Sequence, residues 1–531
     1  MDSIQMLTQI SGKFFYHYKA KAITCAVPIF LFFYLRNTDL HQNFIYLSIL
    51  ALAFFLIFWI SRLKISAEDV PSRILMNFFL SFSIVLLLQS LWAYTFIMEY
   101  IVSGYRGDIF RKAFLRIQSP VYGESELLPM IAIIVALAIM STGTIVLLKT
   151  VSYPYFKNRY KFIYLIVFTV FAATFAISES EDRLLTYYAH QHSFYEDVKL
   201  FDGPKELLKN YTSSMPLLTK RGQHYPPGNL LVLTFGSQIG FLFLLKAICY
   251  LSPLVGFFYL SKLLSVLGFS NEESRFPLFL YLFGFGTIAF VSTSTTPILL
   301  ALFIGASYSV FNNNGDVRLF YPAITGFILS VSFLFSFSAV VMIAFLFIAD
   351  LFIRNYHKQK TFLIWRWLTI LLVVSLFYLC LFFIFGFNMY ECFTISVENN
   401  QKLMTVNPYD NIQRYFLRAS GNLIAFFILP NITAAILTAW SIKELRRTGN
   451  VLMRSYAQSF FLTILIFSFS GLYFLETERI WLFLTPSFAV LAGFWLNSLP
   501  LAGKNKIEQF MMVLTILTSF AIELSYRPFI R

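Results

Sequence analysis

Long apolar segments recur along the whole chain, and they constrain its fold more than any other feature. Residues 43–61 (NFIYLSILALAFFLIFWIS) and 161–177 (KFIYLIVFTVFAATFAI) each approach the roughly 20 residues that a helix needs to cross a bilayer. Among the 531 residues, 58% are hydrophobic and only 13% are charged. Because a water-soluble protein of this length cannot bury so much apolar surface, we expect an all-α polytopic membrane protein.

The apolar segments predict a bundle of about 13–15 transmembrane helices. The predicted spans are 22–35, 43–61, 73–100, 127–148, 162–178, 229–261, 277–293, 297–311, 319–338, 340–353, 367–386, 421–440, 456–474, 480–497 and 508–524. Residues 229–261 fit one helix or two, and 319–353 fits two spans or one bent element. We divide the chain into N-terminal transmembrane helices without an assigned role (1–150), a transmembrane core (151–500) and a C-terminal transmembrane helix (501–531).

Basic residues concentrate in alternate connections between these spans. Segments 149–161 and 354–366 each contain four Lys and Arg and no acid, and 443–454 contains four against one Glu. The N-terminal tail, 62–73 and 501–507 show the same bias. Cytoplasmic loops retain basic residues, so we predict that this side is cytoplasmic. The net charge of +14 then has a membrane explanation and does not indicate nucleic-acid binding.

The remaining connections, 101–126, 179–228, 387–420 and 475–479, fall on the extracytoplasmic side. Segment 179–228 is too long for a simple connector, and its residues 181–201 and 204–211 favour short amphipathic helices on the membrane surface. It ends in KRGQHYPPGNLLVL, in which two prolines stiffen the backbone and Gly228 lets the backbone approach some other group closely. The same prolines also suit an ordinary helix start.

Carboxylates cluster where segment 179–228 leaves the membrane. Glu179, Glu181 and Asp182 follow span 162–178 directly, and Asp197 lies further along. A carboxylate at a lipid–water boundary has an environment that can tune its pKa for general-base chemistry. Simple solvation of a surface loop is the alternative explanation.

A second polar stretch is GLYFLETERIWLFLTP, residues 471–486. Glu476, Glu478 and Arg479 form a very short turn between two apolar helices, where charges usually face a partner or an aqueous cavity. The guanidinium of Arg479 suits a phosphate, because it donates two parallel hydrogen bonds. Pairing of Arg479 with a neighbouring Glu is the alternative. Within 229–261, Lys246 is either a functional charge or the mark of a junction between two helices.

These segments resemble the glycosyltransferase-C superfamily over roughly residues 160–500. FYEDVKLFDGPKELLKNYTSSMPLLTKRGQHYPPG resembles the outer loop of bacterial membrane glycosyltransferases related to the protein-mannosyltransferase and aminoarabinose-transferase group. ETERIWLFLTP is similar to a second, downstream motif of those proteins. The spans before residue 150 fall outside the usual core of that superfamily.

The resemblance implies a GT-C-like bundle in a bacterial inner membrane and a sugar donor attached to a polyprenyl phosphate, used on the extracytoplasmic face. It implies a base at Glu181 or Asp182, with Asp197 as a second acidic position, and the run ESED leaves the choice open. It also places Arg221, His224 and Tyr225 beside donor or acceptor, and Arg479 on the lipid phosphate. The other residues expected to bind substrate are Glu179, Glu476 and Glu478.

The predicted activity is sugar transfer to a hydroxyl of a glycan, lipid or protein acceptor. Such transfer needs a base for the acceptor proton and positive charge for the departing phosphate. No cofactor is certain, since clustered acids can bind Mg²⁺ or Mn²⁺ but their spacing is not diagnostic. The alternatives are a lipid or solute transporter or flippase, and a non-catalytic protein of polysaccharide assembly. A transporter typically shows repeated halves with interrupted spans, which we do not find here.

Overall fold

The computed structural model describes residues 127–178, 194–240, 244–284, 295–312, 319–356, 360–403, 432–470 and 482–526, with scattered positions between these ranges. Near the helix ends, some side chains within these ranges lie outside the description. The chain divides into two compact units, one of Met1–Gly123 with Glu523–Phe529, and one of Glu124–Ile522. The helix Leu127–Ser152 therefore belongs to the larger unit, together with the predicted transmembrane core.

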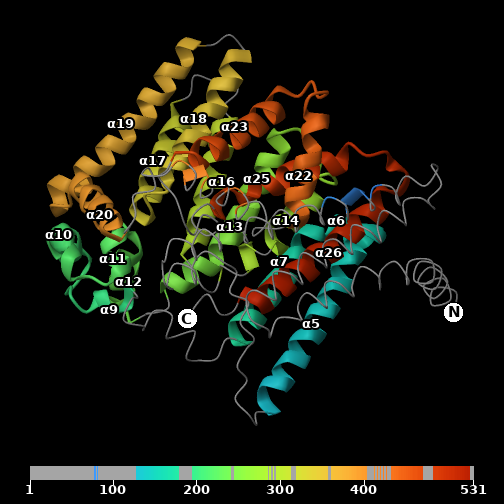
Figure 1. The fold of residues 1–531 in the computed structure, drawn as a ribbon, viewed down its shortest axis with the longest axis horizontal. Coiled ribbons are helices and arrows are strands. Elements are labelled where there is room, and N and C mark those ends of the chain that lie inside the picture. Colours follow the sequence, from blue (N-terminus) through green and yellow to red (C-terminus); the bar gives the residue numbers. More distant parts are fainter. Residues whose placement is uncertain are drawn as a thin grey trace. The chain divides into compact units, whose positions relative to one another are not determined.

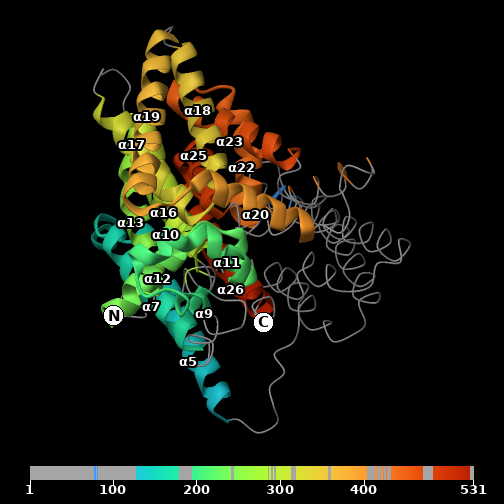
Figure 2. The same cartoon turned by 90° about the vertical axis from the view of Figure 1, so that its left-hand side faces the viewer.

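All regular structure in the described residues is helical, as predicted (Figures 1 and 2). The helices are α5 (Leu127–Ser152), α6 (Pro154–Asn158), α7 (Tyr160–Ser178), α9 (Phe194–Val198), α10 (Pro204–Ser214), α11 (Lys220–His224), α12 (Gly228–Gln238), α13 (Leu244–Val266), α14 (Arg275–Phe283), α16 (Thr296–Asn312), α17 (Phe320–Phe335), α18 (Ala339–Tyr356), α19 (Lys360–Phe385), α20 (Met389–Leu403), α22 (Ile432–Leu445), α23 (Val451–Ser468), α25 (Thr485–Asn497) and α26 (Leu501–Tyr526), with short 3₁₀ turns at Met215–Leu217 and Leu482–Leu484.

Four of the described helices are long and apolar enough to cross a membrane. They are Leu244–Val266, Ala339–Tyr356, Leu363–Phe385 and Val451–Ser468. Shorter apolar helices cover Tyr160–Ala172, Thr296–Asn312, Phe320–Phe335 and Leu482–Asn497. The apolar stretch of α19 is almost wholly exposed, since only 6% of its 18 residues are buried. Such exposure is typical of a helix that faces lipid. The described residues thus indicate a helical membrane protein, while the larger number of predicted spans stays a prediction.

The two segments that the sequence left open each form two helices. Residues 229–261 divide into α12 and α13, and Lys246 lies in the first turn of α13, which fits the junction interpretation. With 11 residues, α12 is only about 16 Å long, too short to cross a bilayer. Residues 319–353 divide into α17 and α18 at Ser336–Ser338.

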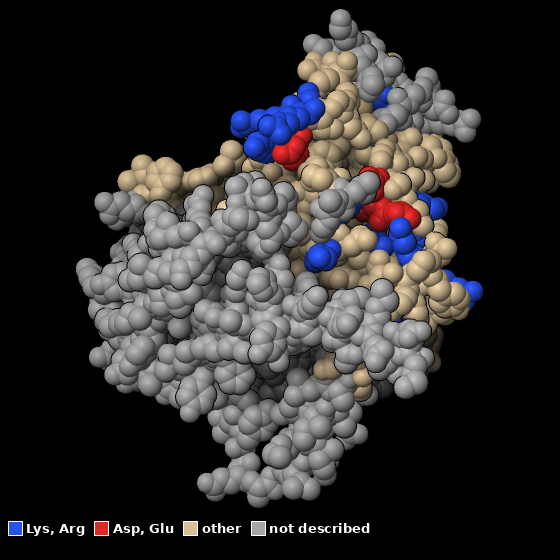
Figure 3. All heavy atoms as spheres, turned by 90° about the vertical axis from the view of Figure 1, so that its right-hand side faces the viewer, with Lys and Arg blue, Asp and Glu red and all other residues tan. Residues whose placement is uncertain are grey.

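The basic connections lie together at one end of the helices. Lys157 pairs with Glu272 at 2.7 Å, and the hydroxyl of Tyr160 donates to the carbonyl of Asn271 at 2.8 Å. These contacts join segment 149–161 to the connection between α13 and α14. Figure 3 views the side on which α6 and α22 lie in Figure 1, and it shows Lys and Arg gathered beside fewer acids.

Further contacts extend this group of connections. The amide of Asn450 donates to the carbonyl of Leu267 at 2.7 Å, and that of Asn497 donates to the carbonyl of Glu273 at 3.1 Å. Arg454 donates to the hydroxyl of Tyr356 at 3.2 Å. Segments 149–161, 354–366, 443–454 and the end of α25, which precedes α26, are thereby linked to one another. Their predicted placement on a single side agrees with these contacts, whereas the N-terminal tail and 62–73 lie outside the described residues.

Two buried charge clusters reinforce the same end. Arg275 of α14 donates two hydrogen bonds, of 2.7 and 2.6 Å, to the carboxylate of Glu508 in α26, and a third to the carbonyl of Thr150 in α5. A bidentate guanidinium–carboxylate pair fixes both partners in direction as well as distance. Three helices far apart in sequence are held together at this point.

The second cluster centres on the carboxylate of Asp350 in α18. It accepts hydrogen bonds from Arg366 and from the indole of Trp367, both at 3.1 Å, and Arg354 lies 3.4 Å away. Arg366 also donates to the carbonyl of Val310 at 2.9 Å, in the last turn of α16. A cation is favourable there, because carbonyl groups at a helix C-terminus are left without partners in the helix.

The opposite ends of these helices meet an apolar cluster. Leu245 and Cys249 at the start of α13, Ile298 at the start of α16, Leu334 at the end of α17 and Phe387 just beyond α19 all belong to it. The same cluster includes residues of α9, α10, α12 and α20, together with Met215 and Leu218, which precede α11. We call this group of helices, residues 194–238 and 389–403, the outer unit, and it lies at the lower end of α19 in Figure 1.

Candidate functional site

The outer unit joins two segments that the sequence predicted on the same side of the membrane. Helix α20, from segment 387–420, packs against α10 and α11, from segment 179–228. The side-chain amide of Asn399 donates to the carbonyl of Gln223 at 3.3 Å across this contact. The two loops therefore form one structure rather than separate connections.

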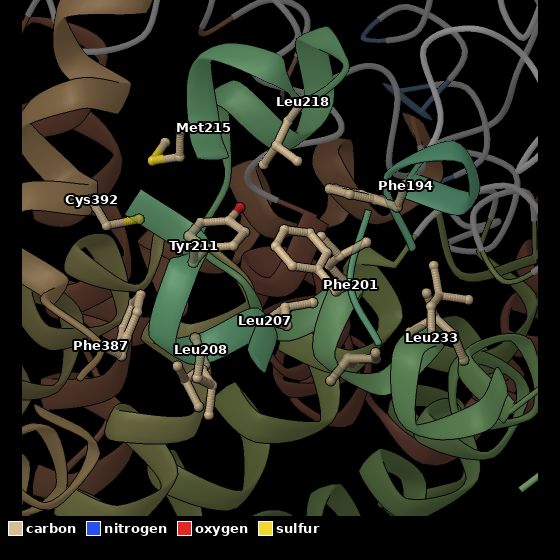
Figure 4. Packing of buried hydrophobic residues seen from close by; sticks show 14 of the residues in the cluster. Phe194, Phe201, Leu207, Leu208, Tyr211, Met215, Leu218, Leu233, Phe387 and Cys392 are labelled. Carbon is tan, nitrogen blue, oxygen red and sulfur yellow. The ribbon is translucent and has the colours of Figure 1, made fainter. Parts of the chain in front are cut away.

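Tyr211 is the central side chain of the outer unit (Figure 4). It is fully buried, its ring meets that of Phe387 edge-on, and Leu208 and Cys392 belong to the same cluster. Its hydroxyl donates to the carbonyl of Tyr225 at 2.7 Å, with the carbonyl of Gly222 as a second acceptor at 3.0 Å. Tyr211 thus connects α10 to Gly222 and Tyr225, which lie on either side of His224 in sequence.

Asp197 is a residue of α9, and its side chain is buried against the start of α11. One carboxylate oxygen accepts from the backbone N–H of Thr219 at 2.7 Å, and the other accepts from its hydroxyl at 2.8 Å. Thr219 directly precedes α11, so Asp197 satisfies a backbone donor where that helix begins. Burial raises the pKa of Asp197, the two hydrogen bonds from Thr219 oppose that rise, and Glu196 adds to it.

Gly222 is required by this arrangement. A Cβ built at residue 222 would lie 2.6 Å from Oδ2 of Asp197 and 2.7 Å from Cβ of Leu218. Both contacts are far shorter than ordinary van der Waals separation. Asp197 was predicted as a catalytic acid, but its closed environment and its two bonds to Thr219 favour a role in positioning α11.

The HYPPG segment connects α11 to α12. Pro227 is the N-cap of α12, and Gly228 is the first residue of that helix. A Cβ built at Gly228 would overlap the carbonyl oxygen of Leu334 and lie 2.6 Å from its carbonyl carbon. The close approach that the sequence analysis expected at Gly228 is confirmed, and the approaching segment is the end of α17. The segment leads into the short α12, however, and not directly into a membrane span.

Three predicted site residues lie in this region. Arg221 and His224 belong to α11, and Tyr225 follows it, with its ring edge-on to that of Phe194 at 6.0 Å. For Arg221 only the backbone is described, while His224 and Tyr225 are partly buried. Asp197 approaches the same short helix through Thr219 and Gly222, so four predicted residues lie on or against α11.

The other predicted site residues are Glu179, Glu181, Asp182, Glu476, Glu478 and Arg479, and all of them lie outside the described residues. The expectation that they gather in one pocket with His224 stays a prediction. Within the described ranges, no group of three or more His, Cys, Asp or Glu side chains could hold a metal ion.

Sequence reasoning missed Tyr211, Thr219 and Gly222 as organisers of this region. Tyr211 carried one signal, since it follows Leu207 and Leu208 at helical spacing in an otherwise polar helix. The pairing of Asp197 with Thr219 has no local signature, because a carboxylate that caps a distant helix follows no fixed spacing.

Comparisons of this chain with protein-family models, with curated proteins and with solved structures found no match.

Proposed function

We propose that the protein is a membrane glycosyltransferase that moves a sugar from a polyprenyl-phosphate donor to a hydroxyl acceptor at the outer unit. One observation carries the proposal: α9–α12 and α20 pack into a single unit. This unit lies at the ends of α13, α16, α17 and α19 that are remote from the basic connections. If the basic end is cytoplasmic, the outer unit is extracytoplasmic. A polyprenyl tail can then stay in lipid while its phosphate reaches the surface.

The proposed reaction assigns a role to each group. Glu181 or Asp182 removes the acceptor proton as the acceptor oxygen attacks the anomeric carbon. The bond from that carbon to the phosphate oxygen breaks, and the polyprenyl phosphate leaves with the electron pair. Arg479 stabilises the charge that develops on the phosphate. Asp197 contributes by holding α11, on which Arg221 and His224 are carried.

Sugar transfer in membranes supplied with a polyprenyl-phosphate sugar tests this assignment. Glu181→Gln, Asp182→Asn and Arg479→Ala are the informative variants, and Asp202→Asn, exposed on the outer unit, is the matched control. Loss of a general base costs about 100-fold or more in rate, so one of the two acid variants should lose at least that much. Arg479→Ala should lose a comparable factor, since one electrostatic contact to the developing charge contributes about 100- to 1,000-fold.

Undiminished transfer in all three variants would remove the site assignment. Movement of a labelled lipid into proteoliposomes without any covalent product would replace the enzyme by a transporter. The two assays measure different products, a covalent sugar adduct and a displaced lipid, so one outcome does not mask the other.

A further inference from the structure

Two lysines at the basic end carry charge that no acid among the described residues balances. The ammonium group of Lys161, at the start of α7, donates to the hydroxyl of Ser261 in α13 at 2.8 Å. The next residue of α13 is Lys262. In the described part of the chain, neither lysine takes part in an ion pair. The nearby Glu272 is already paired with Lys157.

Aromatic rings surround the ammonium group of Lys262. It lies 4.4 Å from the ring centroid of Phe258, 5.7 Å from that of Tyr308 and 6.0 Å from that of Tyr259. The faces of aromatic rings attract a cation, but they carry no net charge. Lys161 reaches α13 at Ser261, the residue before Lys262, so the two lysines bring positive charge to consecutive positions of this helix, and an anion can neutralise it.

Exposed apolar residues extend from both lysines along their helices. Phe162, Ile166 and Val170 follow Lys161 on α7 at intervals of four residues. On α13, Phe258, Val255 and Leu251 precede Lys262 at intervals of four, three and four. Such intervals place the residues of each set on one helix face.

The two apolar faces run in the same direction from the lysines. Helix α7 leads away from the basic end, and α13 leads towards it, with the bond from Lys161 to Ser261 joining the two helices at that end. The positive charge lies at one end, and the apolar faces of α7 and α13 extend away from it. This arrangement is complementary to an amphiphile with an anionic head. A small soluble anion would leave the apolar faces without a partner.

We propose that Lys161 and Lys262 bind the phosphate of an anionic diacyl phospholipid, whose acyl chains lie along the exposed faces of α7 and α13. Lysine binds phosphate as a point charge, and the aromatic rings beside Lys262 suit the interface between headgroup and chain. This site lies at the end of the helices opposite the outer unit, so it is distinct from the proposed transfer site and does not depend on it.

Native mass spectrometry of the full chain in detergent tests the proposal. The probes are phosphatidylglycerol, phosphatidylcholine and inorganic phosphate. Each lysine near an anionic lipid contributes about fivefold in affinity, so Lys161→Gln/Lys262→Gln should weaken phosphatidylglycerol binding by about 25-fold. Lys506→Gln, an exposed lysine of α26 at the same end, is the control and should change little.

The charge-preserving variant Lys161→Arg/Lys262→Arg should bind phosphatidylglycerol within a few-fold of the unaltered chain. The proposal would be overturned by unchanged binding in the Gln double variant, by an equal loss in Lys506→Gln, or by phosphatidylcholine binding as tight as phosphatidylglycerol. Equally tight binding of inorganic phosphate would also overturn it, because the site would then take a soluble anion. None of these readouts involves sugar transfer.

Discussion

Different interactions stabilise the two ends of the helices. At the outer unit, a buried apolar cluster centred on Tyr211 joins α10 to α20 and to the ends of the longer helices. At the basic end, ion pairs and side-chain bonds to backbone carbonyls connect segments that are hundreds of residues apart, such as Arg275 with Glu508. The apolar end draws its contacts from many side chains, whereas the basic end depends on a few charged ones.

This difference has consequences for tolerance to substitution. Apolar contacts are individually weak and additive, so the loss of one removes only part of the stabilisation. A buried ion pair fails differently, since removing one partner leaves the other charged and desolvated. We therefore expect single substitutions to be more damaging at the basic end, provided that they break a buried pair.

The largest expected effect is that of Arg275→Met. The side chain of Glu508 is only 3% exposed, so its carboxylate would remain buried without a cation. Breaking such a pair costs about 3–5 kcal/mol, and we expect a large fall in the melting temperature of the detergent-purified protein. The double variant Arg275→Met/Glu508→Met should recover much of the loss, because no uncompensated charge remains.

Arg447→Met is the matched control for that experiment. Arg447 pairs with Glu444 at 3.6 Å, but its side chain is 66% exposed. An exposed pair contributes little, so the melting temperature should stay nearly constant. Equal losses in Arg275→Met and Arg447→Met would contradict the distinction between buried and exposed pairs.

An intermediate effect is expected for Asp197 in the outer unit. Asp197→Ala removes both acceptors of Thr219, and a lost helix cap costs about 1 kcal/mol. Hydrogen exchange of the amides of α11 should accelerate accordingly, while Asp202→Asn should leave it unchanged. Protection that survives in Asp197→Ala would show that α11 does not depend on this carboxylate.

The titration of Asp197 sharpens the same test. Its pKa is raised on folding, so the folded unit binds more protons than the unfolded chain above pH 3.8. Stability should therefore fall as the pH rises from 3.8 to the raised pKa, and then level off. Asp197→Asn should abolish this dependence when the exchange rates of α11 are corrected for the chemical effect of pH.

The smallest effect concerns Lys157 and Glu272 at the surface of the basic end. The hydrogen bond from Lys157 lowers the pKa of Glu272 below 4.5, with some opposition from desolvation. The pair therefore stabilises above pH 4.5, and this contribution is lost as the pH falls through the lowered pKa. Because the Glu272 side chain is 65% exposed, Lys157→Gln should cost well under about 1 kcal/mol. Melting curves of both proteins from neutral pH into acid would check this, since the difference should shrink as the pH falls through the lowered pKa.

The sequence predicted the organisation of the described helices better than their tertiary pairings. The distribution of Lys and Arg correctly grouped 149–161, 354–366 and 443–454, because positive charge is excluded from the membrane and from the opposite side. Gly228 was recognisable as a point of close approach, since it follows two prolines. The pairing of Arg275 with Glu508 was not predictable, because the two residues are 233 positions apart and no local spacing links the start of α14 to the interior of α26.

The candidate site was predictable only in part. The segment around HYPPG was identified from its stiff, polar residues before an apolar run, and it does organise the outer unit with Tyr211. Asp197 was expected at a reactive position, but its sequence neighbourhood could not reveal that Thr219 would occupy both of its oxygens. The residue type marked Asp197 as a candidate acid, whereas its bonds to Thr219 favour a role in positioning α11.

The contact between Gly228 and Leu334 has a mechanical consequence. Because a backbone carbonyl fills the space beside Gly228, the start of α12 cannot slide along α17 without a collision. His224 is thus coupled mechanically to the last turn of α17. Gly240 and Gly386, which follow α12 and precede α20, have φ values of 69° and 77°, so both ends of this assembly use backbone conformations that are costly for any residue with a side chain.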